Sequence, residues 1–234
     1  MNHLDLFSGI GGFALAASWV WGDEHNIVSF CEIDPFCQKV LKKHWPGVPI
    51  QYDIKEYKHD GTNVDLLTGG YPCQAFSTAC HGHNTAEDLS PWMHIVIRKV
   101  RPRYIIAENV EEKTINGFKK WLEINNYRAF TYNISANEHG ADHERLRWFA
   151  IAHPNDNGKL QGRINEKASM LQSIQHPAWG WKNFARTIRV SDGLPNRLHR
   201  LKSLGNAIVP QCVQPIMQAI KEINENIKLQ SQGA

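Results

Sequence analysis

The sequence predicts an α/β fold in which a doubly wound, mostly parallel sheet carries helices on both faces. Short apolar runs rich in β-branched and aromatic residues alternate with segments of helical spacing, which indicates repeated strand–helix units. At 234 residues, the chain is long enough to bury the core of such a sheet. Polar and glycine-rich turns follow several of the strand-like runs, which is where parallel sheets bind ligands.

Strands and helices are expected in alternation along most of the chain. Strands are predicted at Leu4–Phe7, Ile27–Phe30, Val64–Leu67, Tyr104–Ala107 and Trp148–Ala152. Helices are predicted at Phe13–Trp21, Phe36–His44, Trp92–Val100, Phe118–Ile124 and Val213–Leu229, with a frayed tail over Gln230–Ala234. From about His153 to Arg189 the sequence shows no clear period, and we expect a small inserted lobe there.

The composition is that of an ordinary soluble protein of one medium domain. No run approaches the roughly 18 apolar residues that a membrane-spanning helix needs, and no N-terminal signal pattern is present. The five cysteines are scattered, which favours reduced thiols in a cytoplasm over a disulfide or zinc framework. The cluster Cys80-His81-Gly82-His83 offers metal ligands, but it is crowded into one loop with no second cluster, so no metal site is predicted.

A glycine-rich turn follows the first predicted strand and enters a helix. Its sequence is Phe7-Ser8-Gly9-Ile10-Gly11-Gly12-Phe13. Missing side chains let a ligand approach the backbone, and the helix N-terminus supplies free N–H groups. The glycine spacing differs from the G-x-G-x-x-G pattern of dinucleotide sites. We therefore expect a bound ligand here, of a different kind.

Acidic residues follow the second predicted strand. Glu32 stands at the strand tip, where the hydroxyls of a ribose would donate hydrogen bonds to its carboxylate. For Asp34, an N-cap role before Pro35 explains the carboxylate as well as ligand binding does. Further along, Asp53 and Ile54 offer an acceptor and an apolar wall to a base.

A cysteine stands in a stiff loop directly after the third predicted strand. The loop spans Gly69–Ser77, and Pro72 fixes the backbone just before Cys73, so the thiol is presented outside the apolar run. Glu108 follows the strand Tyr104–Ala107 and should lie at the same edge of the sheet. A thiolate and an acid that face one cavity can divide nucleophilic attack and proton donation between them.

Basic residues gather in two places. Arg145 and Arg147 form the first group, and a second group lies between Arg186 and Lys202, interleaved with aromatic residues. Such a mixture of cations and flat rings suits a nucleic-acid surface. On charge alone, a solvated charged face explains the pattern equally well.

Five stretches of the sequence, in order, form a recognisable set. They are Asp5–Phe13, Gly69–Ser77, Glu108-Asn109-Val110, Glu144-Arg145-Leu146-Arg147 and Gly205-Asn206-Ala207-Ile208-Val209-Pro210. The set resembles the motifs of the DNA (cytosine-5)-methyltransferase family: its S-adenosylmethionine loop, its nucleophile loop, its ENV motif, the later part of its Q-x-R-x-R motif and its G-N-x-x-x-P motif. The resemblance extends over the whole chain and is to a short bacterial or phage type.

The resemblance implies a seven-stranded, Rossmann-like methyltransferase sheet with one antiparallel strand, which the hairpin-like Ala129–Ser135 and Trp148–Ala152 would supply. It divides the chain into an S-adenosylmethionine-binding catalytic domain, residues 1–152, and a small target-recognition region, residues 153–202. The C-terminal segment, residues 203–234, would then return to the catalytic domain.

The resemblance also implies a function. The enzyme would transfer a methyl group from S-adenosyl-L-methionine to carbon 5 of a cytosine flipped out of double-stranded DNA, leaving S-adenosyl-L-homocysteine, in restriction–modification or phage-type DNA modification within a bacterial or phage-infected cytoplasm. Cys73 would form a covalent adduct, Glu108 would face the ring nitrogen N3 and the exocyclic amine, and the loop Thr78–Ser90 would close over the base. Arg145 would hold the base carbonyl or a phosphate and lower the thiol pKa, with Arg147 behind it or on a phosphate.

The cofactor-binding residues implied by the resemblance come from the motifs and strand tips described above. They are Asp5, Phe7, Ser8, Gly9, Gly11, Gly12, Glu32, Ile33, Asp53, Ile54, Pro72, Asn206 and Ala207.

Two departures from the family pattern leave questions open. Asp142-His143 stands where the family usually has Pro-Gln, so the contacts of that glutamine are in doubt. The recognition region is short, and we expect a monomer with a short or relaxed target sequence, or one that depends on a helper protein.

Three alternatives are considered. A relative that methylates transfer RNA would carry a Cys-Phe-Thr signature, which is absent. A catalytically silent DNA-binding module would not need Cys73, Glu108 and Arg145. A dinucleotide oxidoreductase would need a different glycine spacing.

Overall fold

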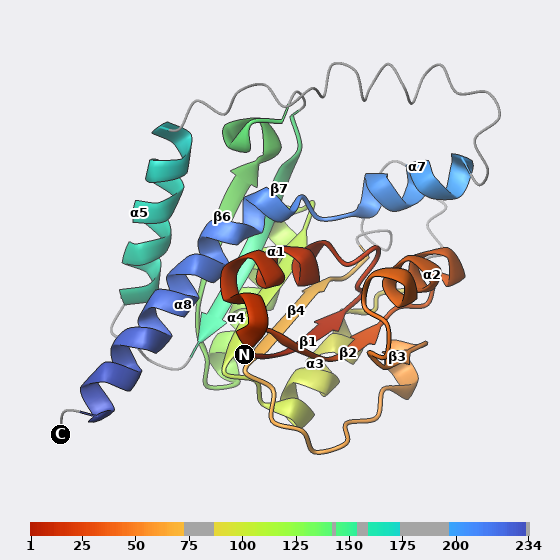
Figure 1. Ribbon diagram of the computed structural model, residues 1–234, viewed down its shortest axis with the longest axis horizontal. Helices are drawn as coiled ribbons and strands as arrows, with labels where there is room; N and C mark the ends of the chain where they lie inside the picture. Colours follow the sequence, from red (N-terminus) through yellow and green to blue (C-terminus); the bar gives the residue numbers. More distant parts are fainter. Residues whose placement is uncertain (73–86, 142–143, 154–158, 174–196, 233–234) are drawn as a thin grey trace.

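The computed structural model describes residues 1–72, 87–141, 144–153, 159–173 and 197–232. Within them, seven strands form one sheet in the order β3-β2-β1-β4-β5-β7-β6, as Figure 1 shows. The strands are β1 (Asn2–Leu6), β2 (Asn26–Cys31), β3 (Ile50–Gln51), β4 (Leu66–Gly70), β5 (Tyr104–Asn109), β6 (Arg128–Ser135) and β7 (Leu146–His153). The sheet is that of an α/β methyltransferase fold, which confirms the predicted fold class.

One strand of this sheet runs against its neighbours. The pairs β1–β2, β1–β4, β2–β3 and β4–β5 are parallel, whereas β7 lies antiparallel between β5 and β6. The carboxyl ends of the parallel strands therefore meet at one edge of the sheet, and β7 is the strand that begins at this edge. We call this the carboxyl edge, and the opposite one the amino edge.

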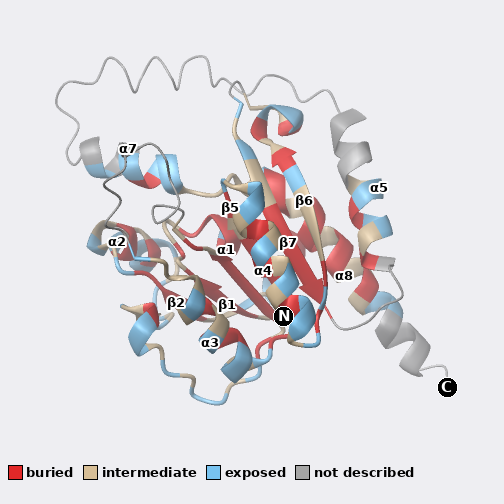
Figure 2. Ribbon diagram, turned by 180° about the vertical axis from the view of Figure 1, so that it is seen from behind, coloured by how far each residue is buried: buried red, intermediate tan, exposed pale blue. Residues whose placement is uncertain are grey.

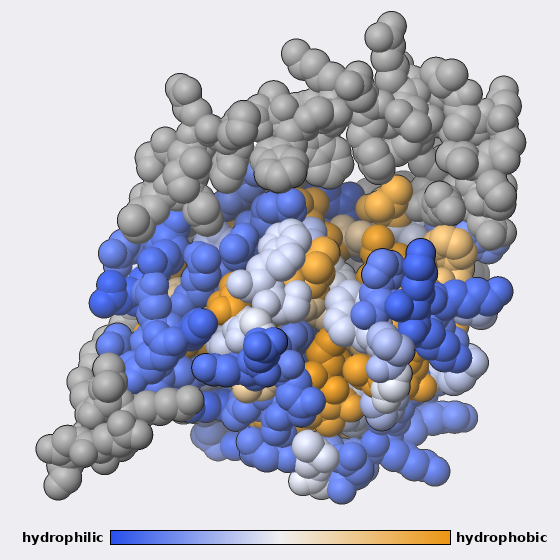
Figure 3. All heavy atoms as spheres, in the orientation of Figure 1, coloured by the Kyte–Doolittle hydropathy of each residue, from blue (hydrophilic) through white to orange (hydrophobic). Residues whose placement is uncertain are grey.

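Helices cover both faces of the sheet. They are α1 (Gly12–Trp21), α2 (Pro35–His44), α3 (Ser90–Val100), α4 (Glu112–Ile124), α5 (Lys159–Ser173), α7 (Arg197–Asn206) and α8 (Pro210–Gln232), with short 3-10 turns η1 (Gly22–Glu24), η2 (Ile54–Glu56) and η5 (Ala136–His139). Apolar residues of α1, α5 and α8 form one core with one face of the sheet, and those of α3 and α4 form a second core with the other. Figure 2 shows buried residues concentrated along the strands and on the inward sides of the helices, and the face seen in Figure 3 is largely polar, with apolar residues near its middle.

The N-terminus of α2 has a clear local cause. The Asp34 carboxylate accepts hydrogen bonds from the backbone N–H groups of Phe36, at 2.8 Å, and Cys37, at 3.4 Å. Pro35 occupies the first helical position, where its fixed φ suits a helix and its missing N–H is not needed. The N-cap interpretation of Asp34 is thereby confirmed.

The structure corrects the sequence prediction at several elements. The strand β3 was not predicted, because two residues give no measurable period. The helix α4 begins six residues before the predicted start at Phe118, since its first turn is polar and carries no apolar period. The helix α8 continues to Gln232, beyond the tail expected from Gln230.

The largest correction concerns the segment expected to be an aperiodic lobe. Residues 159–173 form the helix α5, and its side chains Leu160 and Ile164 are fully buried in the core shared with α1 and α8. This part of the segment therefore packs on the catalytic sheet. Residues 154–158 and 174–196, which hold the rest of the expected lobe beyond β7, lie outside the described residues. In the part of the chain that is described, no helix has both the length and the apolar character needed to cross a membrane.

The packing of α5 yields a first prediction. Replacing Ile164 by alanine should lower the free energy of unfolding by about 2–5 kcal/mol, because it leaves a cavity in a closed core. Urea denaturation measures the change. In the matched control, Arg163→Ala removes an exposed ion pair with Glu166 on the same helix and should change stability by less than about 0.5 kcal/mol. Equal effects of the two substitutions would contradict the packing of α5 against the sheet.

Candidate active site

A cavity of about 320 Å³ opens at the carboxyl edge of the sheet. The turns after β1, β2, β4 and β5 line it, and the end of α7 closes one side. It brings together many of the residues predicted from the sequence: Phe7, Gly9, Glu32, Ile33, Asp53, Ile54, Pro72, Glu108, Arg147 and Asn206. Parallel α/β sheets bind ligands in this position, so the cavity is the candidate active site.

Several predicted residues lie beside the cavity without lining it. They are Asp5, Ser8, Gly11, Gly12, Arg145 and Ala207. The predicted nucleophile Cys73 and most of the predicted closing loop lie outside the described residues, although Pro72, immediately before Cys73, lines the cavity. Ser90, at the end of that predicted loop, is instead the first residue of α3.

The Glu32 carboxylate connects the turns after β1 and β2. One of its oxygens accepts a hydrogen bond from the N–H of Gly9, and the other accepts from the N–H of Asp34, both at 2.7 Å. Burial raises the pKa of Glu32, and the two backbone N–H groups oppose that rise. The carboxylate is thus fixed in orientation, and each oxygen keeps a lone pair for a ligand hydroxyl.

Two positions of the glycine turn must be glycine, because a Cβ atom would clash with a different neighbour at each of them. Gly11 has a φ of 86°, and a Cβ atom there would lie 2.5 Å from the Trp45 ring. A Cβ atom on Gly12 would lie 2.1 Å from Cγ2 of Ile208, so only glycine lets the C-terminal segment approach the start of α1. Gly11 and Gly12 therefore shape the cavity from behind.

Apolar side chains form the walls of the cavity near Glu32. Ile33 is 66% exposed, whereas Ile54 is buried beneath the same opening. Tyr52, which sequence reasoning missed, lines the cavity next to Asp53 and is 60% exposed. The Asp53 carboxylate accepts from the N–H of Lys55 at 2.9 Å and so caps η2. The adjacency of Tyr52 to the Asp53-Ile54 pair was the signal that could have identified it.

Glu108 and Arg147 form an ion pair at the other side of the cavity. The Arg147 Nε atom lies 2.8 Å from a carboxylate oxygen of Glu108, and the Glu108 side chain is only 14% exposed. Burial raises the pKa of Glu108, while the positive charges of Arg147 and Arg145 oppose the rise. A Cβ atom on Gly70 would lie 2.8 Å from the second oxygen of Glu108, so glycine at the end of β4 leaves room for the carboxylate.

Asn109 connects the ends of β4 and β5 beside this ion pair. Its side-chain amide donates to the carbonyl of Tyr71 at 3.1 Å and accepts from the N–H of Glu111 at 3.1 Å. Because Tyr71 precedes Pro72, these hydrogen bonds fix the entrance to the predicted nucleophile loop relative to Glu108.

Arg145 contacts the C-terminal segment of the chain. Its guanidinium donates to the backbone carbonyls of Gly205, at 2.6 Å, and Ala207, at 2.7 Å. The structure therefore places Arg147 in contact with Glu108, and Arg145 in contact with the loop that carries Asn206 into the cavity. Burial, with the neighbouring charge of Arg147, lowers the pKa of Arg145.

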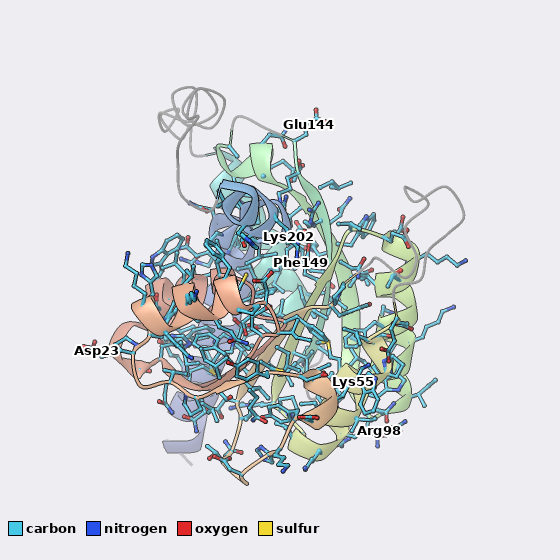
Figure 4. The ribbon with its side chains drawn as sticks, turned by 90° about the vertical axis from the view of Figure 1, so that its right-hand side faces the viewer. Asp23, Lys55, Arg98, Glu144, Phe149 and Lys202 are labelled. Atoms are coloured by element: carbon cyan, nitrogen blue, oxygen red, sulfur yellow. The ribbon has the colours of Figure 1, made fainter. Side chains whose placement is uncertain are left out.

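Three contacts fix α7 over the start of α2. Lys202 pairs with Asp34 at 3.4 Å, His199 stacks on Phe36 with ring centroids 5.8 Å apart, and the Ser203 hydroxyl lies 3.5 Å from the sulfur of Cys37. Figure 4 shows Lys202 on α7 close to α2. Lys202 and Ser203 also line the cavity. The sequence did not predict them as site residues, because they reach the cavity only through the packing of α7 against α2.

Asp5 belongs to a buried polar chain beneath the cavity. Its carboxylate accepts from the Thr68 hydroxyl at 2.6 Å, that hydroxyl lies 2.7 Å from His3, and His3 lies 3.0 Å from His25. Burial raises the pKa of Asp5 and lowers that of both histidines, to about 4 for His25. These shifts favour the uncharged forms of the three side chains, and the hydrogen-bonded chain links β1 to β4.

Comparisons with known proteins agree with this geometry. The sequence model of a family described as C-5 cytosine-specific DNA methylase matches residues 1–192. The type II methyltransferase M2.BsuMI of Bacillus subtilis (strain 168) is 42% identical over 144 residues, which cover 58% of this chain and 33% of that protein. The type II methyltransferase M.CviJI of Paramecium bursaria Chlorella virus IL3A is 24% identical over 221 residues, which cover 90% of this chain and 57% of that protein.

A solved structure has the same fold. The Dnmt2 methyltransferase of S. pombe superimposes with a TM-score of 0.60 at 22% identity, over 75% of this chain and 56% of that one. This chain thus spans about a third to somewhat over half of the length of these relatives.

The Glu108–Arg147 pair yields a second prediction. Burial raises the pKa of Glu108 and the Arg147 charge opposes the rise, so Arg147→Gln should raise this pKa further, and Arg147→Lys, which keeps a positive charge, should raise it less. Titration of ¹³C-labelled glutamate carboxyl groups by NMR measures both shifts. An unchanged or lowered pKa of Glu108 in Arg147→Gln would contradict the ion pair.

Proposed function

Because this chain belongs to the family of C-5 cytosine-specific DNA methylases, we propose that it is a DNA (cytosine-5)-methyltransferase. It transfers a methyl group from S-adenosyl-L-methionine to carbon 5 of a cytosine in double-stranded DNA. The observation that carries the proposal is a single cavity lined on one side by Glu32 and on the other by the Glu108–Arg147 pair. Such a cavity provides for a nucleoside cofactor and a reacting base in adjoining positions.

The residues of the first side fit the nucleoside part of the cofactor. The fixed carboxylate of Glu32 accepts the ribose hydroxyls, and the exposed Ile33 and buried Ile54 offer apolar faces to the adenine. The turn at Phe7 and Gly9 leaves backbone exposed toward the rest of the molecule. S-adenosylmethionine supplies a methyl group on a positively charged sulfur, which makes that methyl electrophilic.

The residues of the second side fit the cytosine. The Cys73 thiolate forms a bond to carbon 6 of the ring, which makes carbon 5 nucleophilic toward the methyl group. Loss of the proton from carbon 5 then allows the Cys73–carbon 6 bond to break and restores the ring. Glu108, whose pKa is raised by burial, lies beside N3 and shares a proton with it in a hydrogen bond while electrons flow into the ring.

The two arginines have distinct roles in this proposal. Arg147 orients the Glu108 carboxyl group and, with its remaining N–H groups, reaches the carbonyl oxygen of the base. Arg145 positions the loop around Asn206, because its Nη2 atom donates to the carbonyls of both Gly205 and Ala207. This assignment exchanges the roles that the motif alone suggested for the two residues.

The DNA must present its cytosine outside the stack. Carbon 6 is inaccessible within a duplex, so the base is flipped into the cavity, at a cost of roughly a few kcal/mol that contacts with the pocket offset. The residues that read the target sequence belong in this proposal to the segment 153–202, and α7, which closes the cavity, connects that segment to the cofactor side. A role in restriction–modification fits the names of the type II relatives.

The third prediction tests the nucleophile. Cys73→Ala should abolish methyl transfer from labelled S-adenosylmethionine to duplex DNA, while fold and cofactor affinity stay nearly unchanged, because the role of the thiol is covalent. Duplex DNA with 5-fluorocytosine at the target, which cannot lose its carbon-5 substituent, should form an adduct with the wild type that survives denaturation.

A second cysteine in the same loop region provides the control. Cys80→Ala removes a thiol seven residues further along the chain and should still give the adduct. The proposed mechanism is wrong if the Cys73→Ala protein retains more than a few per cent of the turnover. If the protein methylates transfer RNA and not DNA, the proposed substrate is wrong and the proposed chemical mechanism still stands.

The fourth prediction tests the cofactor side. Glu32→Gln should weaken the binding of S-adenosylhomocysteine by about 1.5–3 kcal/mol, the range for a hydrogen bond to a charged group. Calorimetry with the natural compound and with its 2′,3′-dideoxy analogue separates ribose binding from a general disturbance. The loss should be small for the analogue, which lacks the hydroxyls.

Glu56→Gln is the matched control for this prediction. It makes the same substitution at an exposed glutamate that does not line the cavity and should leave both affinities nearly unchanged. Equal losses for the two ligands in Glu32→Gln would assign Glu32 to the stability of the turn and not to the ribose.

A further inference from the structure

A second cavity, of about 500 Å³, lies at the amino edge of the sheet. Three loops form it: the loop before β4, the α3–β5 connection with Arg101 and Arg103, and the α4–β6 turn with Asn126 and Tyr127. We call it the amino-edge groove. Since the strands β4 and β5 run from this edge to the active-site edge, the groove and the candidate active site lie at opposite ends of the same strands. In Figure 4, Arg98 on α3 lies at the end of the molecule away from Glu144, with Lys202 between them in this view.

Aromatic rings hold the arginines of this edge in position. The guanidinium of Arg98 lies 5.4 Å from the ring centre of Trp121, that of Arg101 lies 5.5 Å from Tyr127, and that of Arg103 lies 5.2 Å from Tyr104. Side chains restrained in this way lose less conformational entropy when they bind a ligand.

Among the residues that the structure describes, these positive charges have no anionic partner. Arg98 donates to the side-chain oxygen of Asn125 at 2.9 Å, and Arg101 donates to the backbone carbonyl of Asn125 at 3.2 Å. Over the described residues, no carboxylate lies within ion-pair distance of Arg98, Lys99, Arg101 or Arg103. By contrast, Lys119 on the neighbouring helix α4 pairs with Glu123 at 2.7 Å.

One carboxylate does line the groove, and it is already engaged. Asp65 accepts from the N–H of Asn2 at 2.8 Å and from the side chain of Asn63 at 3.3 Å. Arg101 and Arg103 therefore line the groove with one hydrogen-bonded acid, and the chain carries two further cations, Arg98 and Lys99, just before them on α3. The net electrostatic preference of this edge is for a negatively charged ligand.

We infer that the amino-edge groove is a second nucleic-acid site, which binds the phosphodiester backbone of a DNA segment other than the one in the active site. Guanidinium groups match phosphate in geometry and charge, and several in a row suit a repeating polyanion better than a single small anion. Because the groove and the active site occupy opposite edges, one short duplex does not fill both. The choice of DNA among polyanions rests on the proposed function.

The proposal makes one enzyme molecule a bridge between two duplexes. The test mixes the full chain with two populations of a duplex one helical turn long, one carrying a donor dye and the other an acceptor dye. It is run at low salt and at a concentration where light scattering finds a monomer. The wild type should bring the dyes together and produce energy transfer.

The groove variant combines Arg101→Asn with Arg103→Gln. Arg101 has a φ of 51°, and asparagine tolerates this left-handed conformation, so the backbone is preserved. The variant should lose most of the energy transfer, and the slope of log affinity against log salt for the second duplex should fall by about one unit per arginine removed. A second variant, Arg98→Gln with Lys99→Gln, changes exposed positions of α3 and should weaken bridging in the same direction.

The matched control removes two positive charges elsewhere. Lys42→Gln with Lys43→Gln lies at the exposed end of α2, changes the net charge equally and should keep the energy transfer. Equal bridging by the groove variant and the control would overturn the inference, as would a wild type that binds one duplex only. A third outcome is that poly-glutamate binds to the wild type but not to the groove variant, while no second duplex binds. This result would overturn the inference and make the groove a site for an acidic protein.

The same proteins separate this inference from the proposed function. Methyl transfer to a single short duplex should be alike in the wild type, the groove variant and the control. A protein that bridges duplexes without transferring methyl groups would overturn the proposed function and leave the second site standing. An active enzyme that does not bridge would overturn the second site alone.

Discussion

The antiparallel pairing of β7 between β5 and β6 is the constraint on which the candidate active site depends. Every other strand of the sheet reaches the carboxyl edge with its last residue, whereas β7 begins there. In the register of the pair, Asn109 lies opposite Trp148, so Arg147 stands one position beyond the end of β5 and reaches Glu108. A parallel strand in this place would have carried both arginines to the other edge of the molecule.

Two buried glutamates of this edge are stabilised in different ways, and the difference fits the two ligands proposed for them. Glu32 is held by backbone N–H groups, which are fixed dipoles and leave the carboxylate as an acceptor. Glu108 is held by one guanidinium, and burial raises its pKa despite that charge. An acceptor suits the hydroxyls of a sugar, and a carboxyl group beside a guanidinium, with a raised pKa, suits a proton shared with a ring nitrogen.

Local sequence patterns predicted most of the strands and helices, but they could not predict contacts between segments that are distant in the sequence. The alternation of apolar runs located β1, β2 and β5, and the Asp34-Pro35 pair marked the start of α2. Motif order indicated the residues of the cavity on both sides. Which of two arginines separated by one residue reaches Glu108 depends on strand register, and the return of Lys202 to Asp34 spans 168 residues, so neither follows from spacing alone. The helix α5 was missed because only a few apolar residues, such as Leu160 and Ile164, mark its buried side.

The closure of the cavity by α7 has a consequence for the order of events during synthesis. The contacts that close it join residues 166 and 168 positions apart, Cys37 to Ser203 and Asp34 to Lys202. The ribosome synthesises the chain from its N-terminus, so the strands and the Glu32 turn leave the ribosome long before α7 does. The nascent protein would therefore hold most of its sheet while its ligand cavity still lacked one wall, and ligand could contribute fully to stability only after α7 had been made.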